Sequence, residues 1–148
     1  MIQHEPTFKV VRSSAQNYKD GCFVLVEPLI FEWRAKRVVI RVETGFVTNF
    51  ASIPTGFRNL FPVNDKHRLA AVAHDYLYSC AGVARSYEFI KPNGCIIKNN
   101  DGFNVIYDRP EADQLFYDMM ISEGVKQSKA KAMYRAVRYF GFLAWGAK

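Results

Sequence analysis

Three residues with side chains suited to chemistry lie on two predicted helices. His74 and Asp75 are adjacent within HRLAAVAHDYLYS (67–79), which otherwise has the apolar spacing of a buried helix, and Asp113 lies near the start of a later helix. Imidazole nitrogen and carboxylate oxygen bind divalent ions, and a bound ion activates water. One interpretation is therefore a metal site for zinc or manganese with His74, Asp75 and Asp113 as ligands.

This arrangement is similar to the metal site of HD-type phosphohydrolases, which also needs an earlier histidine. The candidate is His67, which precedes His74 on the same predicted helix. At roughly 1.5 Å of rise per residue, the two lie about 10.5 Å apart along the axis. Since each metal–nitrogen bond is only about 2.1 Å long, they would be strained to hold one ion. The spacing weighs against the HD interpretation.

Architecture is the alternative to chemistry. A buried aspartate is costly unless it is paired, and Arg68, Arg85 and Arg109 are close enough in sequence to be partners. His74 would then bridge two elements through its ring nitrogens. Residue chemistry leaves open a structural network, a metal or acid–base site, and a chance surface placement.

Composition predicts one domain over residues 1–148, because 148 residues with 49% apolar content bury one sizeable core but not two. The net charge is +6, and the basic residues are densest on the C-terminal helix: Lys126, Lys129, Lys131, Arg135 and Arg138. These residues form either a solvated helix face or a contact with nucleic acid, a membrane surface or an acidic partner.

Targeting and redox signals are few. No run approaches the roughly 18 apolar residues that a membrane span needs, and MIQHEPTFKVVRSS lacks the apolar core of a signal peptide. We expect synthesis in a cytoplasm and no membrane span. Cys22, Cys80 and Cys95 are widely spaced without a C-x-x-C pair, so we expect reduced, structural cysteines. Neither they nor Ser52 carry a signature of nucleophilic catalysis, and no phosphate-binding glycine loop is present.

The element pattern predicts an α+β fold in which an antiparallel sheet packs against about three helices. Strands are predicted at 8–12, 22–33 and 37–43, with Pro28 bending or dividing the second. An irregular, packed loop follows at 44–65. Between the first two helices, KPNG and NNDG are turn signals that divide 86–108 into a small three-stranded meander.

The helices are predicted at 66–79, from Arg109 to Gly124, and at 128–145. Asn64 or Asp65 is placed to cap the first. The second has the most signals: Asp108 as N-cap, Pro110 and Glu111 in the first turn, and Gly124 as the stop.

Four motifs together resemble a family of small phage and prophage proteins, the domain of unknown function 1353 family. They are TGFVTNFASIP (44–54), AAVAHDYLY (70–78), RPEADQLFYDMM (109–120) and YRAVRYFGFLAW (134–145), and they keep the family's order and spacing from Thr44 to Trp145. The resemblance implies a phage-encoded protein, often found among virion and tail genes, without an established activity.

The family's loop motif usually reads Thr-Asp-Phe-Ala-Ser-Ile-Pro, but this chain has Asn49 at the second position. An amide still forms hydrogen bonds, yet it loses the charge that holds a cation or accepts a proton. We expect Asn49, Ser52, His74, Asp75 and Asp113 to converge, because the loop leads into the first helix and the second helix packs on it.

The favoured expectation is a structural protein of the virion tail or baseplate, made in the host cytoplasm, with other virion proteins as partners and no cofactor. Its His–Asp cluster would lock the loop onto the helices. The first alternative is a metal-dependent hydrolase acting on cell-wall or phosphoester bonds, with His74, Asp75 and Asp113 as ligands and Asn49 or Ser52 orienting the substrate. The second is a basic accessory or inhibitor protein, with nucleic acid as a possible partner of the C-terminal helix.

Overall fold

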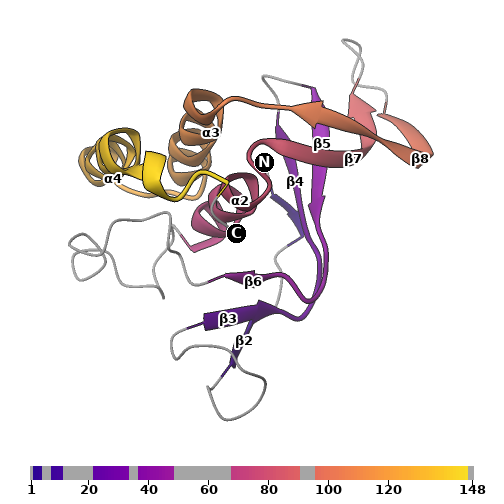
Figure 1. The fold of residues 1–148 in the computed structure, drawn as a ribbon, viewed down its shortest axis with the longest axis horizontal. Coiled ribbons are helices and arrows are strands. Elements are labelled where there is room, and N and C mark those ends of the chain that lie inside the picture. The colour runs from indigo at the N-terminus through magenta and orange to yellow at the C-terminus, as the bar shows by residue number, and fades with distance from the viewer. Residues whose placement is uncertain are drawn as a thin grey trace. The chain divides into compact units, whose positions relative to one another are not determined.

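The computed structural model describes residues 2–4, 8–11, 22–33, 37–48, 68–90 and 96–146. These residues fall into two compact units, one made of residues 1–49 and 84–105 and the other of 50–83 and 106–148. The first contains two antiparallel sheets and the second contains the helices, so the α+β class is confirmed (Figure 1). The expectation of one domain stays a prediction.

Eight strands of the described residues make up the two sheets of the first unit. The larger sheet has the order β1 (Ile2–His4), β4 (Leu29–Trp33), β5 (Val38–Val42), β7 (Val83–Ile90) and β8 (Ile96–Ile106). The smaller sheet has the order β2 (Phe8–Val11), β3 (Cys22–Leu25) and β6 (Val47–Thr48). The predicted strand at 22–33 is two strands, because Pro28 lies between β3 and β4 and lacks a backbone donor.

Alternating side chains of β4 and β5 are buried, as their apolar pattern requires. Leu29 pairs with Val42 and Phe31 with Ile40 across the two strands, and all four side chains have no exposed area. Arg41 lies between the two buried positions of β5, is exposed, and forms an ion pair with Glu43 at 3.0 Å. One face of these two strands is therefore buried, and Arg41 of β5 lies on the other.

The segment between the first two helices differs from the prediction. The expected three-stranded meander is two strands, β7 and β8, which extend the larger sheet beside β5. NNDG, predicted as a turn, lies inside β8. Because β8 is the edge strand, it pairs on one side only, and residues of low strand propensity cost less there.

Three α-helices and a short 3₁₀ helix form the described part of the second unit: α2 (Arg68–Ser79), α3 (Arg109–Ser122), α4 (Gln127–Phe140) and η2 (Gly141–Leu143). α3 packs against both α2 and α4. The predicted caps of α2, Asn64 and Asp65, lie outside the described residues. None of the described helices has the length and apolar character that crossing a membrane requires.

The ends of α3 follow the predicted signals. The Asp108 carboxylate accepts from the Glu111 amide at 2.8 Å, and the Asp108 amide donates to the Glu111 carboxylate at 2.9 Å, which is a complete capping box. Gly124 follows the helix with a φ of +83°. α4 ends at Phe140, earlier than predicted, because the chain tightens into η2 at Gly141.

Candidate functional site

A fully buried carboxylate joins the three α-helices described in the second unit. Asp113 Oδ1 accepts hydrogen bonds from His74 Nε2 at 2.7 Å and from the Tyr78 hydroxyl at 2.6 Å. Asp113 Oδ2 accepts from Arg138 Nη1 at 2.7 Å, and Arg109 Nη1 lies 3.6 Å away. We call these five residues the Asp113 cluster. The side chains of His74 and Asp113 have no exposed area.

Helix periodicity explains why these residues meet. His74 and Tyr78 are four residues apart on α2 and therefore share a face, as do Arg109 and Asp113 on α3. The His74 ring lies 4.1 Å from the Tyr78 ring and 4.8 Å from the Phe116 ring, centroid to centroid. Apolar and aromatic packing thus fixes the imidazole in front of the carboxylate.

Tyr78 approaches the cluster beside a glycine. A Cβ atom added at Gly141 would lie 2.5 Å from the Tyr78 hydroxyl oxygen, so only glycine leaves room for it here. The Tyr78 carbonyl accepts from the Gly146 amide at 2.8 Å, and the Trp145 ring meets the Tyr78 ring edge-on at 5.0 Å. The chain after α4 is therefore fastened to α2 around this one tyrosine.

Arg109 also binds the end of α4. Its Nη1 donates to the carbonyl oxygens of Val137 and Arg138 at 3.2 and 3.1 Å. These carbonyls lie in the last turn, where the helix dipole places partial negative charge that a cation stabilises. Arg109 thus connects the start of α3 to the end of α4, next to the Asp113 carboxylate.

The surroundings of Asp113 keep its carboxyl group ionised. Burial alone would raise the pKa of Asp113, but the hydrogen bond and charge of His74, with hydrogen bonds from Tyr78 and Arg138, outweigh it and lower that pKa. Burial, then the hydrogen bond to Asp113, raises the pKa of Tyr78. Since an ionised carboxylate only accepts, His74 Nε2 carries a proton. The carboxylate is ionised and its donors are protonated.

The lowered pKa of Asp113 predicts a loss of stability in acid. A carboxyl group whose pKa is lower in the folded state stabilises the protein above its unfolded pKa of about 3.9, and this contribution disappears as the pH falls through the folded value. Urea unfolding should be measured between about pH 6 and about pH 3. Acid should lower the free energy of unfolding less in Asp113→Asn than in the wild-type protein. Equal losses would contradict the prediction.

Only some of the predicted site residues come together. His74 and Asp113 form a direct hydrogen bond, and Arg109, expected as a possible aspartate partner, lies beside them. Asp75 is buried on α2 but takes no part in the hydrogen bonds of the cluster. Asn49 and Ser52 lie outside the described residues, so their convergence with the others stays a prediction.

Two members of the Asp113 cluster were missed in the sequence. Tyr78 follows His74 by four residues, which was a usable signal because both fall on one helix face. Arg138 was assigned with the basic residues to one face of α4, and that placement is wrong for this residue. Arg138 follows the buried Val137 and lies at the border of the apolar face of α4, from which its guanidinium reaches Asp113.

The cluster is better suited to holding helices than to binding a metal ion. Both oxygens of Asp113 are engaged, and an arginine lies where a cation would have to approach. Among the residues that the structure describes, no group of three or more His, Cys, Asp or Glu side chains is placed to hold a metal ion.

Comparison with known proteins gives one match. The family described as Protein of unknown function (DUF1353) matches residues 23–137. The match begins in β3 and ends in α4, so it starts nearer the N-terminus than the four sequence motifs do. The searches of the curated proteins and of the solved structures returned no match. Because the matched region covers most of the chain, including His74, Tyr78 and Asp113, the protein belongs to this family of unknown function.

Proposed function

We propose that the protein is a structural component of a phage particle, located in the tail or baseplate, and that the Asp113 cluster maintains its shape. The supporting observation is that a fully buried carboxylate accepts from His74 and Tyr78 on α2 and from Arg138 on α4. The location in a particle is inferred from the sequence resemblance to phage and prophage proteins.

The chemistry of Asp113 supports a structural role over an acid–base role. A catalytic carboxyl group has a pKa near the working pH and an approach for substrate. The pKa of Asp113 is instead lowered by its hydrogen bonds and the charge of His74 against the opposing effect of burial, and its side chain has no exposed area. The carboxyl group is therefore ionised at neutral pH, and both of its oxygens already accept hydrogen bonds.

The proposal is tested with particles purified from cells that carry the encoding phage genome. We expect mass spectrometry to detect the chain in particles banded twice on a density gradient, in constant ratio to the other virion proteins. A cytoplasmic host protein of similar abundance is the control and should be lost between the two gradients. Loss of the chain together with this control would overturn the proposed location.

Removal of metal ions is expected to leave the protein unchanged. Elemental analysis of the purified protein should find zinc and manganese well below one ion per chain, and EDTA should not alter its urea unfolding curve. The reason is that Arg138 Nη1 lies 2.7 Å from Asp113 Oδ2 and balances the charge of this carboxylate. Stoichiometric metal that is lost in His74→Ala but retained in Asp118→Asn would contradict this result and favour the hydrolase alternative.

A further inference from the structure

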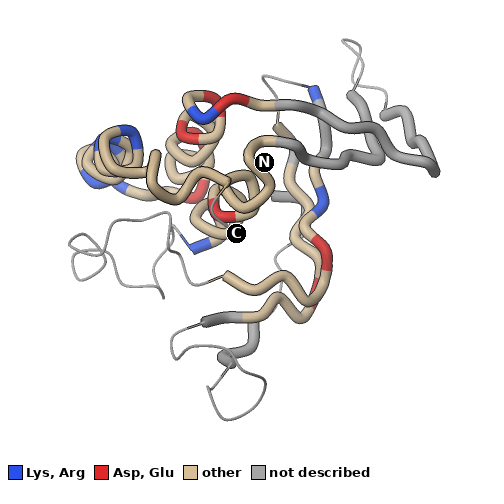
Figure 2. The backbone as a smooth tube through the Cα atoms, in the orientation of Figure 1, with Lys and Arg blue, Asp and Glu red and all other residues tan. Residues whose placement is uncertain are grey.

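The charged residues of α4 all have the same sign. Between Gln127 and Phe140 the helix carries Lys129, Lys131, Arg135 and Arg138 but no aspartate or glutamate. Figure 2 shows the helix in blue and tan without red, in contrast to α3. Arg138 is committed to Asp113. Lys131 and Arg135 are exposed, and within the described part of the chain no carboxylate lies at ion-pair distance from either.

These cations lie beside two adjoining pockets. One, of about 340 Å³, is lined by Gln114 and Tyr117 of α3 and by Lys131, Tyr134 and Arg135 of α4. The other, of about 350 Å³, is lined by Tyr134, Arg135, Arg138 and Tyr139. Both are lined by Tyr134 and Arg135, and we call the two pockets together the α3–α4 groove. None of the described residues that line the two pockets is an aspartate or a glutamate.

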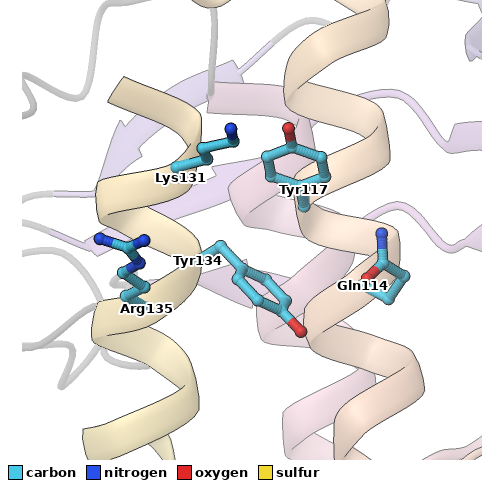
Figure 3. Close-up of a pocket in the computed structure, with 5 residues that line it drawn as sticks. All are labelled: Gln114, Tyr117, Lys131, Tyr134 and Arg135. Carbon is cyan, nitrogen blue, oxygen red and sulfur yellow. The ribbon is translucent and has the colours of Figure 1, made fainter. Parts of the chain in front are cut away.

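Aromatic rings alternate with the cations along the groove. Lys131 extends from α4 toward α3, and Tyr117 of α3 and Tyr134 of α4 lie side by side between the two helices (Figure 3). Their ring centroids are 5.7 Å apart and the rings meet edge-on. Beyond Arg135, Tyr139 is 73% exposed. Tyr134 and Arg138 are four residues apart, as are Arg135 and Tyr139, so successive turns each present one ring and one guanidinium.

Asp118 of α3 orients one of the residues that line the groove. Asp118 accepts from Gln114 Nε2 at 2.9 Å, which holds the amide group at the groove edge. A ligand with negative charge and flat rings satisfies both kinds of side chain, because phosphates pair with Lys and Arg while bases stack on tyrosine. Bases are available for stacking only in an unpaired strand.

We propose that the α3–α4 groove binds single-stranded nucleic acid. Lys131 and Arg135 contact phosphates, and Tyr139 and Tyr134 provide stacking surfaces for bases. An acidic protein segment would satisfy the cations but would make no particular use of an exposed tyrosine face. The proposal goes beyond the structural role and does not depend on it, because the groove residues tested below are outside the Asp113 cluster.

The test uses the full chain and a fluorescein-labelled dT20 oligonucleotide in anisotropy titrations at low salt. We expect a Kd between roughly 1 and 100 μM that weakens steeply as salt rises. Arg135→Glu should weaken binding by about tenfold or more and reduce the salt slope. Tyr139→Ala should weaken binding by about fivefold or more without changing the salt slope, since stacking releases no counterions.

Arg41→Glu is the matched control, since it makes the same charge change at an exposed residue of β5. It should bind dT20 as the wild-type chain does, and circular dichroism should show that all variants are folded. Four results would overturn the proposal. The first two are no binding of dT20 at low salt, and an equal loss of dT20 affinity in Arg41→Glu and Arg135→Glu. The other two are competition by thymidine 5′-monophosphate as strong as that by unlabelled dT20, and equally strong competition by polyglutamate together with full binding by Tyr139→Ala. The last two would indicate a nucleotide and an acidic protein, respectively.

Discussion

Replacing Asp113 with asparagine is expected to lower the free energy of unfolding by about 3–5 kcal/mol, the usual cost of removing one partner from a buried ion pair. The side chain is fully buried and accepts hydrogen bonds from His74, Tyr78 and Arg138. An asparagine amide of the same size cannot accept from all three, and it leaves the Arg138 charge without its counterion. Since domains are stable by only about 5–15 kcal/mol, urea unfolding should show a large shift of the midpoint.

Two variants calibrate this result. Asp118→Asn changes the same atoms on α3 but affects a carboxylate with an exposed hydrogen bond to Gln114, and it should cost about 0.5 kcal/mol or less. Tyr78→Phe removes one donor and leaves the ion pair, and it should cost about 1.5–3 kcal/mol. A loss in Asp113→Asn no larger than that in Asp118→Asn would show that the cluster does not hold the helices together.

Replacing Gly82 with alanine is expected to lower the free energy of unfolding by about 2–4 kcal/mol, because the costs of backbone strain and of a steric clash are combined. Gly82 links α2 to β7 with a φ of +81°, which an L-residue adopts at a cost. An added Cβ would overlap the backbone carbonyl of Tyr107, whose amide donates to the Gly82 carbonyl at 2.9 Å. Since a backbone atom cannot rotate away, this hydrogen bond has to open.

Gly45→Ala separates the two contributions. Gly45 has a φ of +90°, but an added Cβ there meets nothing within 4 Å. This variant should show only the strain, about 1–2 kcal/mol, and the excess in Gly82→Ala measures the clash. Thermal or urea unfolding of both variants provides the comparison. Equal losses in the two variants would mean that the Gly82–Tyr107 contact relaxes at no cost.

The most reliable predictions from the sequence were those with local causes. The capping box at Asp108 and Glu111 and the stop at Gly124 depend on residues a few positions apart, so α3 was located correctly. A strand was likewise predicted at 37–43, where β5 alternates buried Ile40 and Val42 with exposed Arg41. Turn propensity in NNDG failed because pairing at the sheet edge overrides the preference of single residues.

The site was predicted only in its core. The chemistry of the side chains singled out His74 and Asp113, and the need to pair a buried aspartate led to Arg109 as one of three candidate arginines. The sequence gives no distance between α3 and α4. Arg138 was therefore grouped with the other cations of its helix, although helix packing brings it to within 2.7 Å of Asp113. Tertiary packing decides which cation of a basic helix becomes a counterion. Helix periodicity alone does not identify that cation.

The hydrogen bond between Gly82 and Tyr107 has a consequence for variation in chain length. It joins the residues at which the chain leaves the helical unit and returns to it. The segment that contains β7 and β8 is therefore an excursion of the chain whose two ends are held together by this hydrogen bond. The entropic cost of holding the two ends of such a segment together grows only with the logarithm of its length, by about 0.6 kcal/mol per doubling. Residues inserted or deleted between β7 and β8 should therefore barely affect the stability of the helices.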